Sequence, residues 1–168
     1  MFEKTLLFSF LSMILICSGC SLKTENPEIF QRFSPCPNSP KCVSSVSSKS
    51  DHFIDPITYT GTANPMERLS EIMKEMPRVK TITEEEDYLH YEVRSIFFRF
   101  VDDVEFSHDK KAGLIHIKSG AGIGYYDFGV NRRRLEKARK EFNNRLTNDM
   151  HNAKSLINSS LIESGKDA

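Results

Sequence analysis

Polar and charged side chains that could bind an anion or transfer a proton gather in two stretches of the sequence. An arginine guanidinium binds phosphate or carboxylate groups through paired hydrogen bonds, and a carboxylate can act as a general acid or base. Such residues form either a ligand site or a buried ionic network, and the sequence leaves both interpretations open. The candidates are Arg94, Asp102, Asp103, Asp127, Asn131 and Arg132.

The arginine run from Arg132 to Arg134 lies in the first turn of a predicted helix, for which Asn131 is the candidate N-cap. The helix dipole is positive at this end, so each arginine there costs about 0.3–1 kcal/mol unless an anion is close. In one interpretation the anion is internal, and Asp102 and Asp127 pair with the arginines. In the other, the arginines hold a ligand such as a phosphate, a carboxylate or a lipid headgroup.

Asp102 and Asp103 belong to a predicted strand from Phe97 to Phe106. Side chains alternate between the two faces of a strand, so Asp102 shares the apolar face of Val104 and points toward the core. A buried carboxylate costs several kcal/mol without a cationic or hydrogen-bonding partner, so we expect such a partner beside Asp102. Asp103 points to the opposite face, which argues against a paired-carboxylate active site.

The sequence contains no pattern typical of a known catalytic or cofactor site. Its five histidines are scattered, and no nucleophile–base pair or metal-ligand spacing accompanies them. Gly120, Gly122 and Gly124 precede the arginine helix, but their spacing matches neither the dinucleotide fingerprint nor the phosphate loop. Bulges or a close approach of backbone segments explain these glycines more simply. We therefore expect no metal and no cofactor, and the sequence favours a noncatalytic role over an enzymatic one.

Residues 1–19 have the layout of a secretory signal peptide. A lysine precedes an apolar run from Leu6 to Ile16, which is about half as long as the ~20 residues that span a bilayer. The segment Cys17-Ser18-Gly19-Cys20 resembles a bacterial lipobox, so we expect Cys20 to carry acyl chains such as palmitate and to begin the mature protein. The alternative is an ordinary signal peptide followed by an incidental cysteine.

Lipidation at this cysteine predicts where the protein resides. Ser21, rather than an aspartate, comes next, which by resemblance to lipoproteins of bacteria with two membranes favours the outer membrane, with the domain facing the periplasm. Residues 20–35 then hold the lipidated cysteine and a flexible tether. Balanced charges, 23 basic against 23 acidic, indicate no nucleic-acid partner. The expected partners are the membrane, through the lipid anchor, and an anionic small molecule or an envelope protein.

Cys36 and Cys42 are the two cysteines that remain once the signal peptide is removed and Cys20 is acylated. An even pair in an oxidising compartment, on either side of a proline-stiffened turn, indicates a disulfide that contributes about 2 kcal/mol. The alternative is a metal or redox site. The sequence does not support that alternative, because the chain after Cys20 contains no second cysteine pair, no Cys-x-x-Cys spacing and no histidine in the loop.

Residues 36–147 have the periodicity of a single α+β domain. Ile54 to Tyr59 predicts a first strand, and an amphipathic helix follows, with Asn64 and Glu67 forming a capping box. The remaining predicted strands are Val79–Thr83, Tyr88–Ser95, Phe97–Phe106 and Leu114–Ser119. The order β-α-β-β-β-β-α predicts an antiparallel sheet of about four to five strands with two helices packed on one face. Residues 148–168 extend the second helix into a polar tail.

Three motifs of the chain resemble a known family of small exported proteins, those that share the domain of unknown function 1499. The motifs are CPNSPKCVSS at Cys36 to Ser45, FVDDVEF at Phe100 to Phe106 and GYYDFGVNRRRLE at Gly124 to Glu136. The chain departs from the family pattern at Gly120-Ala121-Gly122, where the family has a more polar, arginine-containing stretch. The resemblance implies export, a disulfide and an α+β fold, but no activity.

Together these observations favour a noncatalytic, lipid-anchored protein of the bacterial envelope that binds a ligand or maintains the envelope. The alternative is an envelope hydrolase or transferase that acts on an anionic substrate. In that case Asp102 or Asp103 is the acid–base group and an arginine binds the anionic moiety. A carboxylate with a raised pKa in a cleft would favour the enzyme.

Overall fold

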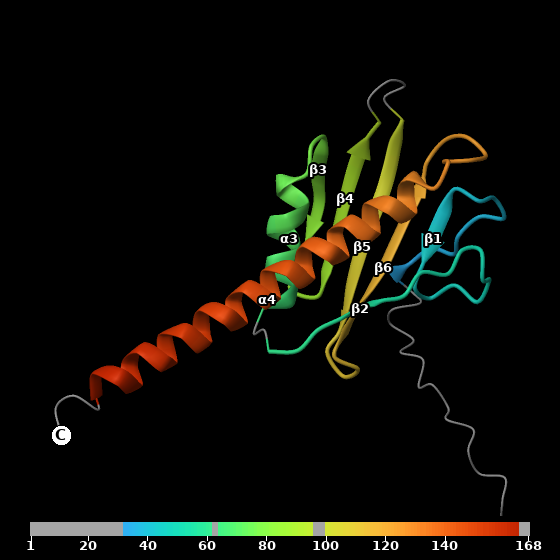
Figure 1. The fold of residues 1–168 in the computed structure, drawn as a ribbon. Coiled ribbons are helices and arrows are strands. Elements are labelled where there is room, and N and C mark those ends of the chain that lie inside the picture. The colour runs from blue at the N-terminus through green and yellow to red at the C-terminus, as the bar shows by residue number, and fades with distance from the viewer. Residues whose placement is uncertain (1–31, 62–63, 96–99, 165–168) are drawn as a thin grey trace, which may run out of the picture.

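The computed structural model describes residues 32–61, 64–95 and 100–164 of the chain. One antiparallel sheet carries two helices on a single face (Figure 1). The sheet order is β1-β6-β5-β4-β3, and β2 also pairs with β6. The strands are β1 (Cys42–Ser44), β2 (Ile57–Thr58), β3 (Val79–Glu84), β4 (Tyr88–Arg94), β5 (Val101–Asp109) and β6 (Leu114–Ala121), and the helices are α3 (Pro65–Glu75) and α4 (Val130–Ser164).

The α+β fold and the antiparallel sheet are as predicted, but the sheet has six strands, one more than the predicted order contained. The additional strand is β1, which begins at Cys42 and pairs with the end of β6. In this pairing Cys42 lies opposite Gly120. The predicted first strand shortens to the two residues of β2. The predicted strand from Phe97 begins at Val101 in the described chain, and residues 96–99 lie outside the described residues.

The central strands alternate between a face toward the helices and a polar face. Leu89, Tyr91 and Val93 of β4 are all buried on the inner face, as the period of two in the sequence predicted. The inner face packs against the apolar sides of both helices and forms one core. Its main members are Leu69, Ile72 and Met73 of α3, Val104 and Phe106 of β5, Ile115 and Ile117 of β6, and Leu135, Ala138 and Phe142 of α4.

Helix α3 begins at Pro65, directly after Asn64, where proline is favoured because its missing N–H has no helical partner. The predicted capping box does not form. Asn64 makes no side-chain cap hydrogen bond, and its Nδ2 instead donates to Glu67 Oε2 over 3.0 Å. The helix is therefore stabilised mainly by burial of its apolar stripe, as most protein helices are.

Helix α4 crosses the sheet, and its C-terminal part extends past the edge of the sheet (Figure 1). Arg145 ties it to α3 through ion pairs with Glu71 and Glu75. Every residue of the core lies between Val43 and Leu146, so a chain that starts at Ser21 keeps the whole core. Among the described residues, no helix combines the length and the apolar character needed to cross a bilayer.

Cys36 and Cys42 form a disulfide, as predicted, with their Sγ atoms 2.07 Å apart. The bond closes the loop that leads into β1. Gly120 of β6 lies against this loop, and a Cβ atom added there would come within 3.3 Å of Cys42 Sγ. The glycine thus permits a close approach between the disulfide and the end of β6, which is the simpler of the two roles that the sequence suggested for it.

Candidate functional site

Two of the predicted site residues, Asp102 and Asn131, meet in one network around Arg134. Arg134 Nη2 donates to Asp102 Oδ2 over 2.7 Å, and Arg134 Nη1 donates to Asn131 Oδ1, also over 2.7 Å. The side chains of Arg134 and Asp102 are only 12% and 9% exposed. The network joins β5 to the first turn of α4, so the inward-pointing carboxylate has a cationic partner.

Asn131 lies inside this junction and is not the N-cap of α4. Its side chain is fully buried, where Oδ1 accepts from Ser119 Oγ over 2.5 Å and Nδ2 donates to the Lys41 carbonyl over 3.1 Å. Asp127 takes the capping role instead, because its two carboxylate oxygens accept from the backbone N–H groups of Gly129 and Asn131 over 2.8 and 2.9 Å. Asp127 is therefore bonded to backbone, and the expected pairing with an arginine is replaced by a cap.

Arg132 and Asp103 lie outside the network. Arg132 Nη2 donates to the backbone carbonyls of Phe53 and Asp51 over 2.7 and 3.2 Å, which fixes the loop before β2. Asp103 is on the opposite face of the sheet, where its Oδ1 lies 2.8 Å from His90 Nε2. The arginines of the run therefore have different structural roles, since Arg132 holds the loop before β2 and Arg134 holds the helix to β5.

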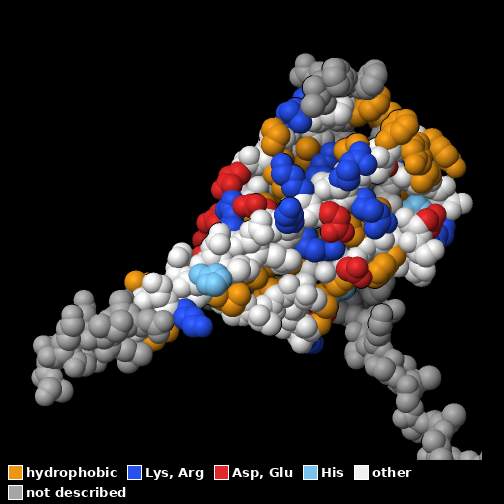
Figure 2. Space-filling view, viewed as in Figure 1, with side chains coloured by type: hydrophobic (Ala, Val, Ile, Leu, Met, Phe, Trp, Pro, Cys, Tyr) orange, Lys and Arg blue, Asp and Glu red, His pale blue; other side chains and the backbone are white. Residues whose placement is uncertain are grey.

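Arg94 lines a cleft of about 440 Å³ beside the first turns of α4. We call it the basic cleft, because five of its lining residues are cationic and none is acidic. Figure 2 shows lysine and arginine side chains gathered on this face of the molecule. The cationic residues are Arg78, Arg94, Arg133, Arg134 and Lys137, and the apolar ones are Met76, Pro77, Val93 and Val130.

Three separate segments of the chain bring these cations together. On α4, Arg133 and Lys137 are four residues apart and so share one side of the helix. At the ends of β3 and β4, Arg78 Nε donates to the Arg94 carbonyl over 3.0 Å, and the Arg94 N–H donates to the Arg78 carbonyl over 3.2 Å. This pairing brings Arg78 and Arg94 together as lining residues of the same cleft.

The cations of the cleft differ in how they are neutralised. Arg134 is paired with Asp102, whereas Arg133 Nη1 donates only to a backbone carbonyl, that of Phe128, over 2.8 Å. Within residues 32–61, 64–95 and 100–164, no carboxylate forms an ion pair with Arg94, Arg133 or Lys137. Like charges are therefore held close together without an internal anion between them.

Sequence reasoning considered Arg133 and Arg134 only as members of the arginine run, and it did not include Arg78 or Lys137. Helical spacing could have added Lys137 to the arginine run, since it follows Arg133 by four residues. Arg78 carries no comparable signal, because it reaches the cleft only through the pairing of β3 with β4.

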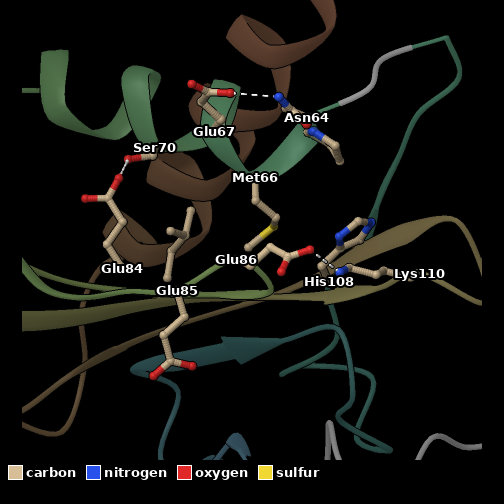
Figure 3. Close-up of a pocket in the computed structure, with 11 residues that line it drawn as sticks. Asn64, Met66, Glu67, Ser70, Glu84, Glu85, Glu86, His108 and Lys110 are labelled. Atoms are coloured by element: carbon tan, nitrogen blue, oxygen red, sulfur yellow. Dashed lines mark hydrogen bonds and ion pairs between the residues drawn. The ribbon is translucent and has the colours of Figure 1, made fainter.

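A second cavity, of about 360 Å³, lies between the start of α3 and the β3–β4 turn (Figure 3). Its acidic side chains already have partners. Glu84 Oε1 accepts from Ser70 Oγ and Lys74 Nζ over 2.6 and 2.7 Å, and Glu86 Oε1 accepts from Lys110 Nζ over 2.5 Å. The hydrogen bond from Lys74 holds the pKa of Glu84 below its ordinary value.

His108 is the group in this second cavity that could transfer a proton. Burial lowers the pKa of His108, and its Nε2 hydrogen-bonds with the Tyr59 hydroxyl. Ser70, the serine of the cavity, is bonded to Glu84 instead. In the part of the chain that the structure describes, no group of three His, Cys, Asp or Glu side chains could hold a metal ion.

The comparisons with known proteins give a family but no activity. A search of curated proteins and a search of solved structures each found no match. The family described as "Protein of unknown function (DUF1499)" matches residues 32–142, a range that contains both the Arg134 network and the basic cleft. This range is well over half of the 168-residue chain. The chain therefore belongs to the DUF1499 family of proteins of unknown function.

Proposed function

We propose that the protein is a noncatalytic binding module of the bacterial cell envelope that holds an anionic group in the basic cleft. The observation that carries this proposal is the charge of the cleft, which has five cationic lining residues and no acidic one. Arg94, Arg133 and Lys137 have no carboxylate partner among the described residues. An anion placed between them replaces repulsion with attraction and so lowers the free energy of the folded protein.

The chemistry of the cleft favours a phosphate or carboxylate attached to an apolar body. A guanidinium group such as that of Arg133 binds both anions through paired hydrogen bonds. The first turns of α4 add the positive end of the helix dipole. Met76, Val93 and Val130 supply an apolar wall for the rest of the ligand.

Binding is favoured over the hydrolase or transferase alternative because the two proposed acid–base groups are already engaged. Asp102 is held by Arg134 in a mostly buried ion pair. Asp103 is paired with His90 on the opposite face of the sheet, away from the basic cleft. Neither carboxylate lines the cleft where an anionic substrate would bind.

The place of action in the proposal is the periplasmic face of the outer membrane, where acyl chains on Cys20 anchor the protein. The support is the lipobox-like segment Cys17-Ser18-Gly19-Cys20, followed by Ser21. The disulfide between Cys36 and Cys42 also supports export, because such bonds persist in oxidising compartments.

The binding proposal is tested by isothermal titration of the chain from Ser21 onward with pyrophosphate and with glycerol phosphate. Arg133→Ala combined with Lys137→Ala is expected to weaken binding about tenfold or more, because charge-assisted hydrogen bonds are lost. Lys140→Ala is the matched control, since Lys140 is exposed on the same helix and does not line the cleft. Absence of binding by the unmutated chain, or equal weakening by Lys140→Ala, would contradict the proposal.

The anchoring proposal is tested by labelling with palmitate in a bacterium that produces the full chain. Cys20→Ser is expected to abolish the label and to leave the precursor uncut, whereas Cys17→Ser keeps both labelling and processing. A labelled and normally processed Cys20→Ser protein would show that Cys20 is not the site of lipidation.

A further inference from the structure

Large apolar side chains crowd the surface of the loop between β6 and α4, which we call the aromatic loop (residues 122–129). Ile123, Tyr125, Tyr126 and Phe128 are 64%, 72%, 57% and 77% exposed, and Val130 at the start of α4 is 40% exposed. Figure 2 shows hydrophobic side chains gathered at a corner of the molecule, next to the lysine and arginine side chains. A contiguous exposed apolar patch of this kind marks a contact with a partner or a membrane.

The backbone of the aromatic loop is held in place. The Asp127 carboxylate accepts from two backbone N–H groups, and the Gly122 N–H donates to the Val101 carbonyl over 3.0 Å. Phe128 has a φ of 54°, a left-handed conformation that residues other than glycine rarely adopt. Its ring meets the Tyr126 ring edge-on, with centroids 5.0 Å apart. Backbone strain of this type gathers at functional sites.

Basic side chains border the aromatic loop. Lys41 Nζ donates to the Gly122 carbonyl over 3.5 Å, and Arg133 Nη1 donates to the Phe128 carbonyl. Arg94 ends the strand that leads to this end of the sheet. The aromatic side chains are thus flanked by positive charge.

Acidic side chains lie at the other end of the sheet. The run from Glu84 to Asp87 occupies the β3–β4 turn, at the end of β4 opposite Arg94. Basic partners accompany this run, because Lys74 pairs with Glu84 and Lys110 pairs with Glu86. One end of the domain therefore carries the aromatic loop with basic side chains beside it, and the other carries an acidic turn that is paired with basic side chains.

We propose that the aromatic loop docks the domain onto an anionic lipid bilayer. Tyrosine side chains such as Tyr125 and Tyr126 favour the membrane–water interface, where the ring is buried and the hydroxyl stays hydrated. Phe128 and Ile123 enter the acyl region, and each basic residue near an anionic surface strengthens the attraction. The basic side chains beside the loop are attracted by the same surface, which orients the domain with the loop toward the lipid.

The docking site goes beyond the proposed anion cleft, and it needs neither a cleft ligand nor the lipid anchor. It is nevertheless compatible with an anchor on Cys20. Arg32, where the described chain begins, pairs with Glu85 and Asp87. These residues lie at the end of the seven-residue strand β4 that is away from the aromatic loop, and the length of the strand separates the two ends by about 23 Å. The eleven residues from Ser21 to Gln31 reach at most about 36 Å, so an anchored domain can bring the loop to its own membrane.

A single tryptophan tests the docking directly, because the chain contains none. The Phe128→Trp variant of the chain from Ser21 onward is mixed with vesicles of phosphatidylglycerol and phosphatidylcholine, or of phosphatidylcholine alone. We expect its fluorescence to shift to the blue, and to be quenched by brominated acyl chains, with the anionic vesicles. The control is Ile82→Trp, because Ile82 is 41% exposed on β3, away from the loop, and should show neither effect.

Partition measurements complete the test. Tyr125→Ser combined with Phe128→Ser is expected to weaken binding to the anionic vesicles about tenfold or more, whereas Ile82→Ser leaves it unchanged. Pyrophosphate binding should survive the double substitution, since neither side chain lines the basic cleft, and an unchanged melting temperature excludes misfolding. The proposal is overturned if neither vesicle type shifts the fluorescence of Phe128→Trp, if Ile82→Trp responds equally, or if the double variant binds vesicles as tightly as the unmutated chain.

Discussion

The ion pair between Asp102 and Arg134 fixes the first turn of α4 to the sheet, and it therefore sets the position of the side of the basic cleft that α4 forms. The pair is mostly buried, which makes it costly to break. Loss of the carboxylate would leave a guanidinium charge away from water without its partner, and this penalty exceeds the net contribution of the pair itself.

We predict that Asp102→Ala lowers the free energy of unfolding by about 3 kcal/mol, as measured by urea denaturation. Asp103→Ala is the matched control, because Asp103 is 49% exposed and its hydrogen bond with His90 lies on the opposite face of the sheet. We expect the control to cost less than about 1 kcal/mol. Equal losses in the two variants would mean that the buried pair has no special role in stability.

Burial lowers the pKa of His116, so folding favours its neutral form. In the unfolded chain this histidine takes up a proton near its ordinary pKa of about 6.5. Its contribution to stability is therefore present above that pH and is lost as the pH falls toward the lower pKa of the folded state.

His116→Gln removes this titration, while the amide can still hydrogen-bond with Ser45 Oγ, which lies 3.1 Å from His116 Nδ1. We predict a smaller loss of unfolding free energy between about pH 7 and about pH 5 in the variant. Some loss should remain, because the pKa of His108 is also lowered by burial. Identical pH profiles for the variant and the unmutated chain would contradict this prediction.

At the scale of residues, the alternation of side chains along a strand predicted that Asp102 points inward, and its exposure is 6%. The exchange of roles between Asp127 and Asn131 could not be predicted in the same way. It depends on the loop turning at Phe128 and Gly129, both with positive φ, which brings the aspartate back to the helix start. Sequence spacing alone does not reveal such a turn.

At the scale of elements, the junction between β6 and α4 positions both proposed sites. Its aromatic loop carries the exposed rings, and the helix that follows carries Arg133 and Lys137 of the cleft. Asp127 caps the helix and so connects the two.

We predict that Asp127→Ala costs about 1 kcal/mol of unfolding free energy, because two helix-start N–H groups lose their acceptor. Asp127→Asn should cost less, since asparagine is an equally favoured N-cap. Faster amide hydrogen exchange at Gly129 and Asn131 in the alanine variant would locate the effect at the cap. Unchanged exchange at both amides would show that the cap does not hold the junction.

The long strands β4 to β6 were predictable because their period of two extends over seven to nine residues. The short strand β1 was not, since three residues after a proline-rich loop carry no period, and only pairing with β6 makes them a strand. The basic cleft was not predictable either, because Arg78, Arg94 and Lys137 come from three separate segments.

At the scale of the whole molecule, the balanced composition hides a local cluster of basic side chains that have no carboxylate partner among the described residues. A formal net charge of zero argues only against a general attraction to polyanions. In the fold, the run from Glu84 to Asp87 lies at one end of β4, and the basic cleft and aromatic loop lie at the other. The acidic run is paired with Lys74, Lys110 and Arg32, so the basic cleft and its neighbouring loop are the part of the domain that attracts an anionic partner.

The most direct test of the account is to locate a bound anion on the domain. Amide chemical shifts of the isotope-labelled chain from Ser21 onward are followed by NMR during titration with pyrophosphate. The account predicts saturable shifts at the cleft residues that carry a backbone amide N–H, which are Met76, Arg78, Val93, Arg94, Ser95, Val130, Arg133, Arg134 and Lys137. Saturable shifts confined to other parts of the domain, or none at all, would contradict the proposal that this cleft binds anions.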